Sequence, residues 1–169
     1  MKGFIASPIG FYEDFLQQTL RTVRLVRVFG DNDLEMRPAA GMMSLSEQCN
    51  HICASNGFIK ALLEDESPTT DAFHCTHDTS SIEAVVASMK SMADHIRLAS
   101  AKITQDRWMQ RVTPFGPEWR LSRGQLCYMM LDHESHHRGQ ITVYARLAGK
   151  TPPTLYAPAK ELLLEPYAS

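Results

Sequence analysis

Apolar residues recur along the chain at the three- and four-residue spacing of amphipathic helices, and no segment has the strict alternation of a half-buried β-strand. Four segments follow this pattern and are predicted to be helices: residues 8–29, 45–64, 81–106 and 122–148. In the first segment, the predicted inward positions are Tyr12, Leu16, Thr19 or Leu20, Val23 and Val26. Because each amphipathic helix must bury its apolar stripe, four of them predict an all-α protein folded as a four-helix bundle.

Residues that favour helix ends support these boundaries. Ser7 is predicted to cap the first helix with Pro8 at its first position, and Gly149 follows the last helix. In a capping box, a serine hydroxyl and a Glu or Gln side chain each accept a hydrogen bond from the other residue's backbone N–H. Such boxes are predicted before the other three helices: Ser44 with Glu47, Ser80 with Glu83, and Ser122 with Gln125.

Three linkers join these helices, and two of them carry features of their own. The linker of residues 107–121 is rich in aromatic side chains, including Trp108 and Trp119, and is predicted to pack over one end of the bundle. The linker of residues 65–79 contains His74, Cys75 and His77. A Cys/His metal clip is one interpretation of that stretch, and a mobile loop without metal is the one we favour.

The composition adds limits to this picture. The chain has 169 residues, which predicts one domain spanning residues 1–169. Its formal net charge of −2 lacks the basic excess of nucleic-acid-binding proteins. No apolar run approaches the ~18 residues of a membrane span, and the start of the chain is too short and interrupted for a signal peptide. Four cysteines in a chain of this length do not make a disulfide framework. We therefore expect a cytoplasmic protein that binds neither nucleic acid nor membrane.

The fourth predicted helix carries the most informative cluster. Of the seven histidines in the chain, His133, His136 and His137 fall within five residues. At ~100° of rotation per residue, His133 and His137 lie about 40° apart, within the apolar stripe of this helix, whereas Glu134 and His136 lie nearer its edges. Two neutral imidazoles one turn apart on a buried face form half of a site for a divalent transition metal. The alternative is a histidine pair that only hydrogen-bonds within the core, at a high desolvation cost.

A third ligand is expected from another helix. On the second helix, His51 shares a face with Leu45, Ser55, Phe58 and Leu62, and therefore can point into the bundle. The residues alone leave two readings open: a metal ligand, or a core histidine with a single hydrogen bond. The remaining candidates are predicted to be bystanders: Cys49 and Cys53 as small buried residues, and His95 as a solvent-facing one.

Two known metal motifs overlap the cluster. His133-Glu134-Ser135-His136-His137 is a literal H-E-x-x-H, the zinc-protease motif in which the Glu is the general base. The extended protease motif needs Gly at 140 and His at 143, where this chain has Gln140 and Val143, although a later Glu161 or Glu165 can replace that histidine. The chain also lacks a strand to hold a peptide. Glu134 and His137 match half of a di-iron site, which needs the motif twice. Neither motif is favoured.

The run from Asp132 to Pro153, with its His-His-Arg-Gly-Gln core, resembles the DinB family of DinB/YfiT-like four-helix metalloenzymes. Residues 44–63 match this family more loosely. The resemblance implies a metal site of three histidines, which map onto His51, His133 and His137. It also implies a homodimer, nickel or zinc as the divalent ion, and thiol-dependent relatives such as bacillithiol S-transferases and mycothiol-dependent isomerases.

Three protein ligands leave a coordination position for substrate, which is typical of a catalytic metal site. The leading hypothesis is therefore a metal-dependent S-transferase or hydrolase, in which a low-molecular-weight thiol or water attacks a small electrophilic molecule. The candidate catalytic residues are Glu134, as a base or as a partner of an imidazole N–H, and Gln140, which points inward and can orient substrate. The alternative is a non-catalytic metal-binding bundle of the stress response.

Overall fold

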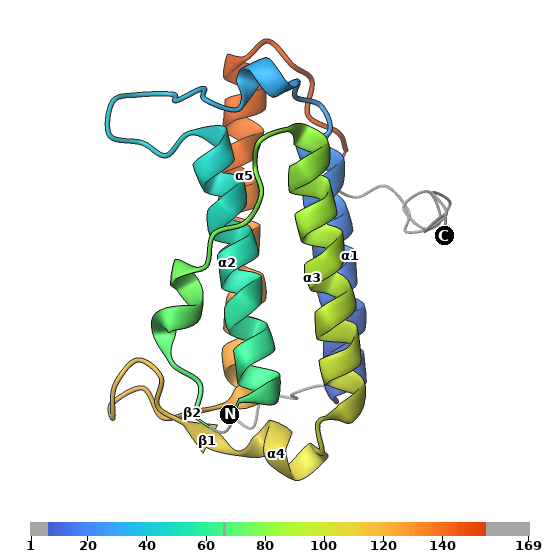
Figure 1. Ribbon diagram of the computed structural model, residues 1–169, viewed down its shortest axis with the longest axis vertical. Coiled ribbons are helices and arrows are strands. Elements are labelled where there is room, and N and C mark those ends of the chain that lie inside the picture. The colour runs from blue at the N-terminus through green and yellow to red at the C-terminus, as the bar shows by residue number, and fades with distance from the viewer. Residues whose placement is uncertain (1–6, 66, 155–169) are drawn as a thin grey trace.

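The computed structural model describes residues 7–65 and 67–154, and these residues form an all-α four-helix bundle (Figure 1). The bundle helices are α1 (Pro8–Val26), α2 (Leu45–Glu64), α3 (Ile82–Lys102) and α5 (Arg123–Leu147). The connections contain η1 (Asp31–Asp33), η2 (Thr70–His74), the short helix α4 (Gln105–Met109) and an antiparallel pair of two-residue strands, β1 (Arg111–Val112) and β2 (Leu121–Ser122). The predicted all-α bundle is confirmed. None of the described helices has the length and apolarity that crossing a membrane requires.

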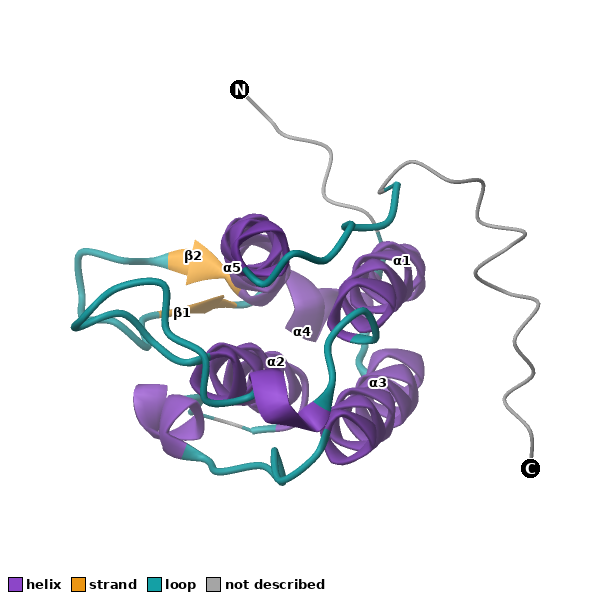
Figure 2. Ribbon diagram, turned by 90° about the horizontal axis from the view of Figure 1, so that it is seen from above, coloured by secondary structure: helices purple, strands orange, loops and turns teal. Residues whose placement is uncertain are grey.

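The four long helices stand at the corners of a square, and each contacts two neighbours (Figure 2). α2 packs between α3 and α5, and α1 packs between the same two helices on the opposite side. α1 and α5 run in one direction and α2 and α3 in the other, so the linker between α2 and α3 returns along the length of the bundle (Figure 1). This order places α2 directly beside α5, the two helices on which the candidate ligands lie.

The apolar core is divided into two clusters. One contains the first half of α2 and the last turns of α5, with Cys49, Ile52 and Ile141 among its members. The other contains the second half of α2 and the first turns of α5, with Phe58 and Leu126. Neither cluster includes a residue of α5 between 132 and 140. The middle of α5 is therefore a polar layer between two apolar ones.

The predicted aromatic linker does pack over one end of the bundle. Trp108 of α4 is fully buried, and its ring lies 5.4 Å from that of Phe11 on α1, measured between centroids. The indole also rests on Gly124, where a Cβ atom would come within 2.5 Å of it. Only glycine permits this close approach, which fixes the start of α5 against the linker.

Several local predictions differ from the structure. α1 ends at Val26 and not at residue 29, because Val28 and Phe29 donate to carbonyls three residues back, in the tighter geometry of a 3₁₀ turn. α3 ends at Lys102 and not at residue 106, because Ile103 is extended and Thr104 caps the separate helix α4. The predicted box at Ser80 is wrong: Ser81 is the N-cap and accepts from the Ala84 N–H at 3.1 Å.

The inward face of α1 also differs from its prediction. Phe11 and Phe15 are completely buried, whereas Tyr12 and Leu16, the residues after each, are only partly buried. The helix is thus rotated by about one residue, or ~100°, in its first two turns. Two large aromatic rings bury more apolar area than Tyr12 and Leu16 would, since the tyrosine hydroxyl keeps a preference for the surface.

Candidate metal centre

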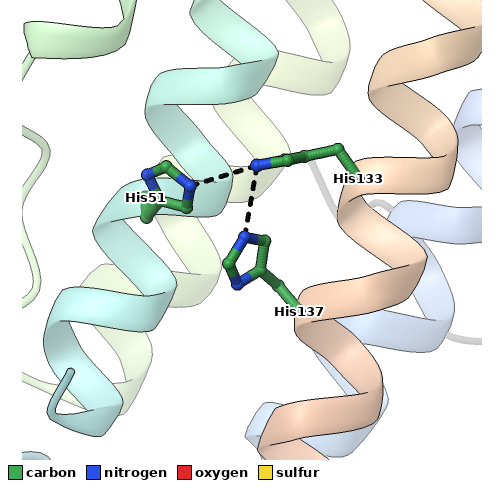
Figure 3. Close-up of side chains that lie close together, drawn as sticks. All are labelled: His51, His133 and His137. Atoms are coloured by element: carbon green, nitrogen blue, oxygen red, sulfur yellow. Dashed lines mark hydrogen bonds between the residues drawn. The ribbon is translucent and has the colours of Figure 1, made fainter. Parts of the chain in front are cut away.

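Three imidazoles meet at the polar middle of the α2–α5 contact: His51 from α2, and His133 and His137 from α5 (Figure 3). The Nε2 atom of His133 lies 3.1 Å from Nε2 of His51 and 3.2 Å from Nε2 of His137. One nitrogen of each ring belongs to a group whose members all lie within 4.8 Å of one another. The structure thus brings together the three histidines that the sequence singles out.

Local structure explains why these rings converge. His133 and His137 are one helical turn apart, so both project from the same side of α5. His51 lies two turns after the N-terminus of α2, where Ser44 and Glu47 form the predicted capping box. The Glu47 carboxylate also binds the Arg37 guanidinium at 2.6 and 2.8 Å, so the preceding linker is tied to this helix end. The start of α2, and with it the height of His51 against α5, is therefore well defined.

The electrostatics of the three rings favour neutral imidazoles. Burial lowers the pKa of His51 and of His133, and the neighbouring imidazoles lower that of His133 further. Burial, together with His133 and His51, lowers the pKa of the buried His137 to about 4. At neutral pH the site therefore presents uncharged nitrogens with free lone pairs, the form in which histidine binds a metal.

The donor set fits a divalent ion. Nε2 of His133 faces the Nε2 atoms of both other rings, and one ring nitrogen cannot be a full hydrogen-bond donor to one neighbour and an acceptor from the other. Its Nδ1 is buried and has no hydrogen-bond partner among the described residues. Three lone pairs that point at one another repel, whereas a cation between them would bind all three.

Gln48 belongs to this site, although no sequence motif marks it. Gln48, almost completely buried on α2, places its Oε1 atom 2.7 Å from Nδ1 of His137. Its Nε2 group donates to Oε1 of Gln140 at 2.9 Å and lies 3.5 Å from the Tyr144 hydroxyl. That hydroxyl donates to the Met43 carbonyl at 2.7 Å. The signal that was available is its position: a glutamine three residues before His51, on the adjoining face of an otherwise apolar helix side.

The two candidate catalytic residues lie in different places. Gln140 is half-buried beside the imidazoles, with its Oε1 atom 2.9 Å from Nδ1 of His137 and its Nε2 atom 3.0 Å from the exposed His136. Glu134 is completely buried and faces α1, where its carboxylate accepts from the Thr22 hydroxyl at 2.6 Å. Burial raises the pKa of Glu134. The H-E-x-x-H motif is therefore split between two faces of α5, which is not the arrangement of a zinc-protease base.

Comparison with known proteins agrees with the fold and identifies the family. The model of the DinB family matches residues 5–166 of the chain. The chain belongs to the DinB family. The uncharacterized protein YrdA of Bacillus subtilis is 35% identical over 85 residues, which cover 46% of this chain and 50% of YrdA. The chain thus spans about half the length of this curated relative.

Solved DinB structures share the fold. The DinB-like protein YjoA of Bacillus subtilis superposes with a TM-score of 0.71 at 20% identity, over 86% of this chain and 96% of YjoA. A DinB-like protein from Bacillus cereus gives a TM-score of 0.72 at 22% identity, over 87% and 96% of the two chains. A DinB family member from Exiguobacterium sibiricum gives 0.65 at 17% identity, over 90% and 99%. At these identities the likeness shows the fold alone.

In this DinB protein, the His and Cys residues that were predicted not to bind metal lie outside the histidine cluster. His74, Cys75 and His95 are exposed, and the backbone N–H of His77 donates to the Asn50 side chain at 2.8 Å. No second group of metal-ligating side chains is found within residues 7–65 and 67–154. Cys49, Cys53 and Cys127 are buried free thiols, as predicted for the first two, and burial raises the pKa of Cys53 to about 12. Glu161 and Glu165 lie outside the described residues.

Proposed function

We propose that this DinB protein is a divalent-metal-dependent enzyme that transfers a thiol to, or hydrolyses, a small electrophilic molecule. His51, His133 and His137 are the proposed ligands. The observation that carries the proposal is the convergence of three neutral imidazole nitrogens, all within 4.8 Å of one another, in a group that includes no carboxylate of the described residues. Nickel and zinc are the ions we favour, because the resemblance to the DinB family implies them and both accept imidazole ligands.

Three protein ligands keep a coordination position for a small molecule, and a divalent ion there lowers the pKa of a thiol or water bound to it. The protein's own residues would supply the rest of the site. Gln48 and Gln140 hold the ring of His137 from its outer side. Of the two candidate catalytic residues, we favour Gln140 for contact with substrate, since its amide lies among the imidazoles while the Glu134 carboxylate is turned towards Thr22.

The cysteines support an external nucleophile. Three of the four are buried, and burial raises the pKa of each, so they remain protonated thiols at neutral pH. None of them belongs to the histidine group. A low-molecular-weight thiol or a water molecule would therefore serve as nucleophile. Free thiols of this kind persist in a reducing compartment, which supports the proposed cytoplasmic location.

The outer face of α5 supports a homodimer. Gly139, Val143 and Leu147 form a stripe at helical spacing, and Val143 and Leu147 are 49% and 60% exposed. A Cβ atom at Gly139 would meet nothing within 4 Å, so a second helix can approach closely there. We propose that this stripe packs against a second copy. Sedimentation of Val143→Glu at half the wild-type mass would support that assignment.

The enzyme proposal is tested on protein purified without a histidine tag. Metal content is measured by mass spectrometry before and after incubation with Ni²⁺, Zn²⁺ or Co²⁺. The loaded protein is then mixed with 1-chloro-2,4-dinitrobenzene and a panel of thiols that includes bacillithiol and mycothiol. We expect one ion per chain and turnover with a preferred thiol, both lost in His137→Ala. A wild-type protein that binds no ion would end the proposal, and one that binds metal without turning over any substrate would favour the non-catalytic bundle.

A further inference from the structure

We propose that Gln48 is a positioning residue of the metal centre. Its amide oxygen holds His137 in the tautomer that carries the proton on Nδ1, so that Nε2 keeps its lone pair for the ion. The inference rests on the proposed metal site but concerns a residue that no motif marks. It starts from one contact, the 2.7 Å distance between Oε1 of Gln48 and Nδ1 of His137.

The surrounding contacts fix the orientation of the Gln48 amide. Its Nε2 group points at two oxygens, Oε1 of Gln140 at 2.9 Å and the hydroxyl of Tyr144 at 3.5 Å. A flipped amide would place the Gln48 oxygen against the Gln140 oxygen, unless Gln140 turned as well, and against the Tyr144 hydroxyl oxygen in either case. The Tyr144 hydroxyl already donates to the Met43 carbonyl, so it can only accept from Gln48. The oxygen of Gln48 is thus the atom that faces His137, and the ring must supply the proton.

Gln140 offers a second acceptor for the proton on Nδ1 of His137, but Gln48 is the better placed of the two. The Oε1 atom of Gln140 is also near Nδ1 of His137, but at 2.9 Å, and it already accepts from the Gln48 amide. Gln140 is half-buried, whereas Gln48 is only 3% exposed. One pattern satisfies all four side chains and also lets the Tyr144 hydroxyl accept from Gln48: His137 donates to Gln48, Gln48 donates to Gln140, and Gln140 donates to Nε2 of His136 at 3.0 Å. In this pattern the tautomer of His137 follows from Gln48.

The consequence for binding follows from general metal chemistry. A hydrogen bond to the far nitrogen of an imidazole ligand fixes its tautomer and ring orientation, and its loss typically weakens metal affinity 10- to 100-fold. Gln48→Met removes the acceptor while keeping the length of the side chain. Gln48→Glu keeps an oxygen acceptor at the same place, and the Gln140 amide can turn to donate to it. Ser55→Ala is the matched control, because Ser55 is buried on α2 and its hydroxyl donates to the backbone carbonyl of His51, at 2.8 Å, and not to an imidazole.

Titration with Co²⁺, followed by its visible absorption, measures affinity and ligand geometry together. We expect Gln48→Met to weaken Co²⁺ binding 10- to 100-fold and to shift the absorption bands. Gln48→Glu should remain within about threefold of the wild type, and Ser55→Ala should be unchanged in both readouts. Circular dichroism of the metal-free proteins reports which variants fold. A folded Gln48→Met variant with wild-type affinity and spectrum would overturn the proposal.

A second measurement needs neither metal nor a variant. Long-range ¹⁵N–¹H NMR of the metal-free wild type identifies which nitrogen of each histidine carries the proton. We expect the proton of His137 on Nδ1. A proton on Nε2 would refute the role of Gln48 even if the protein binds metal well. Conversely, the expected tautomer in a protein that binds no ion would sink the proposed function and leave the Gln48 contact standing, so the two failures are distinguishable.

Discussion

Two polar groups lie on different faces of the same turns of α5, and they differ in almost every respect. Towards α2, His133 and His137 meet His51 in a half-buried cluster whose pKa values are lowered. Towards α1, Glu134 meets Thr22 in a completely buried place, and burial raises its pKa. Residues that are adjacent in the sequence, such as His133 and Glu134, therefore lie in two different environments. A short motif on a helix describes one function only if its members share a face.

The Glu134 side of α5 has more buried polar atoms with poor hydrogen bonding than the histidine side. Oγ1 of Thr19 has no hydrogen-bond partner among the described residues, and the Asn56 amide of α2 lies beside the Glu134 carboxyl group without good hydrogen-bond geometry. Buried polar groups of this kind are usually satisfied by ordered water. On the histidine side, by contrast, Gln48 and Gln140 form a continuous hydrogen-bonded chain. The first group therefore concerns stability, whereas the second is organised to hold ring nitrogens in place.

The largest expected effect is on the histidine side. His137→Ala removes a ligand and should weaken metal binding by more than the ~100-fold that loss of a ligand's hydrogen-bond partner costs. Isothermal titration with Zn²⁺ measures this change. His95→Ala, an exposed histidine on α3, is the control and should bind like the wild type. Equal loss of affinity in both variants would mean that the cluster is not the metal site.

On the buried side we expect a change in stability without a change in metal binding. Thr22→Val removes the hydroxyl that donates to Glu134 and leaves a buried carboxyl group short of a partner, which costs about 1–3 kcal/mol of unfolding free energy. Thr19→Val is the matched control, since the buried Thr19 hydroxyl has no partner among the described residues, and it should be neutral or stabilising. Urea denaturation measures both. If Thr22→Val also loses its metal, the two faces of α5 are coupled and the comparison fails.

The sequence could not predict that Glu134 and the histidines of α5 face different neighbouring helices. Helical periodicity and serine caps predict the four helices, because both depend on local spacing. The spacing of His133 and His137 likewise predicts that both imidazoles lie on one side of α5, where the structure places them. The direction of Glu134 depends instead on how α1 packs, and the inward face of the first two turns of α1 was predicted wrongly, although Val23 and Val26 are buried as expected. Gln48 is recognised only when α2 and α5 are placed side by side, since 89 residues separate it from His137.

A smaller effect is expected from pH. The pKa of His137 is lowered to about 4 in the folded protein, from an ordinary value of 6.5, so the unfolded chain binds more protons between these pH values. The metal-free protein should therefore keep its full stability above pH 6.5 and lose part of it as the pH falls towards 4. Urea midpoints in the presence of a chelator measure this loss. His137→Gln should show a shallower dependence than the wild type, and His95→Gln the same dependence. A wild type whose midpoint rises on acidification would contradict the sign.

The smallest effect is expected in the linker that returns from α2 to α3. His74 and Cys75 are exposed and belong to no cluster of ligands within the described part of the chain. The double variant His74→Ala with Cys75→Ser should change the unfolding free energy by no more than ~0.5 kcal/mol, as is usual for surface positions. Its Zn²⁺ stoichiometry should equal that of the wild type, because the proposed ligands lie on α2 and α5. Loss of one bound ion from this variant would reveal a second site in the linker, and the histidines of α5 would then no longer account for all of the metal.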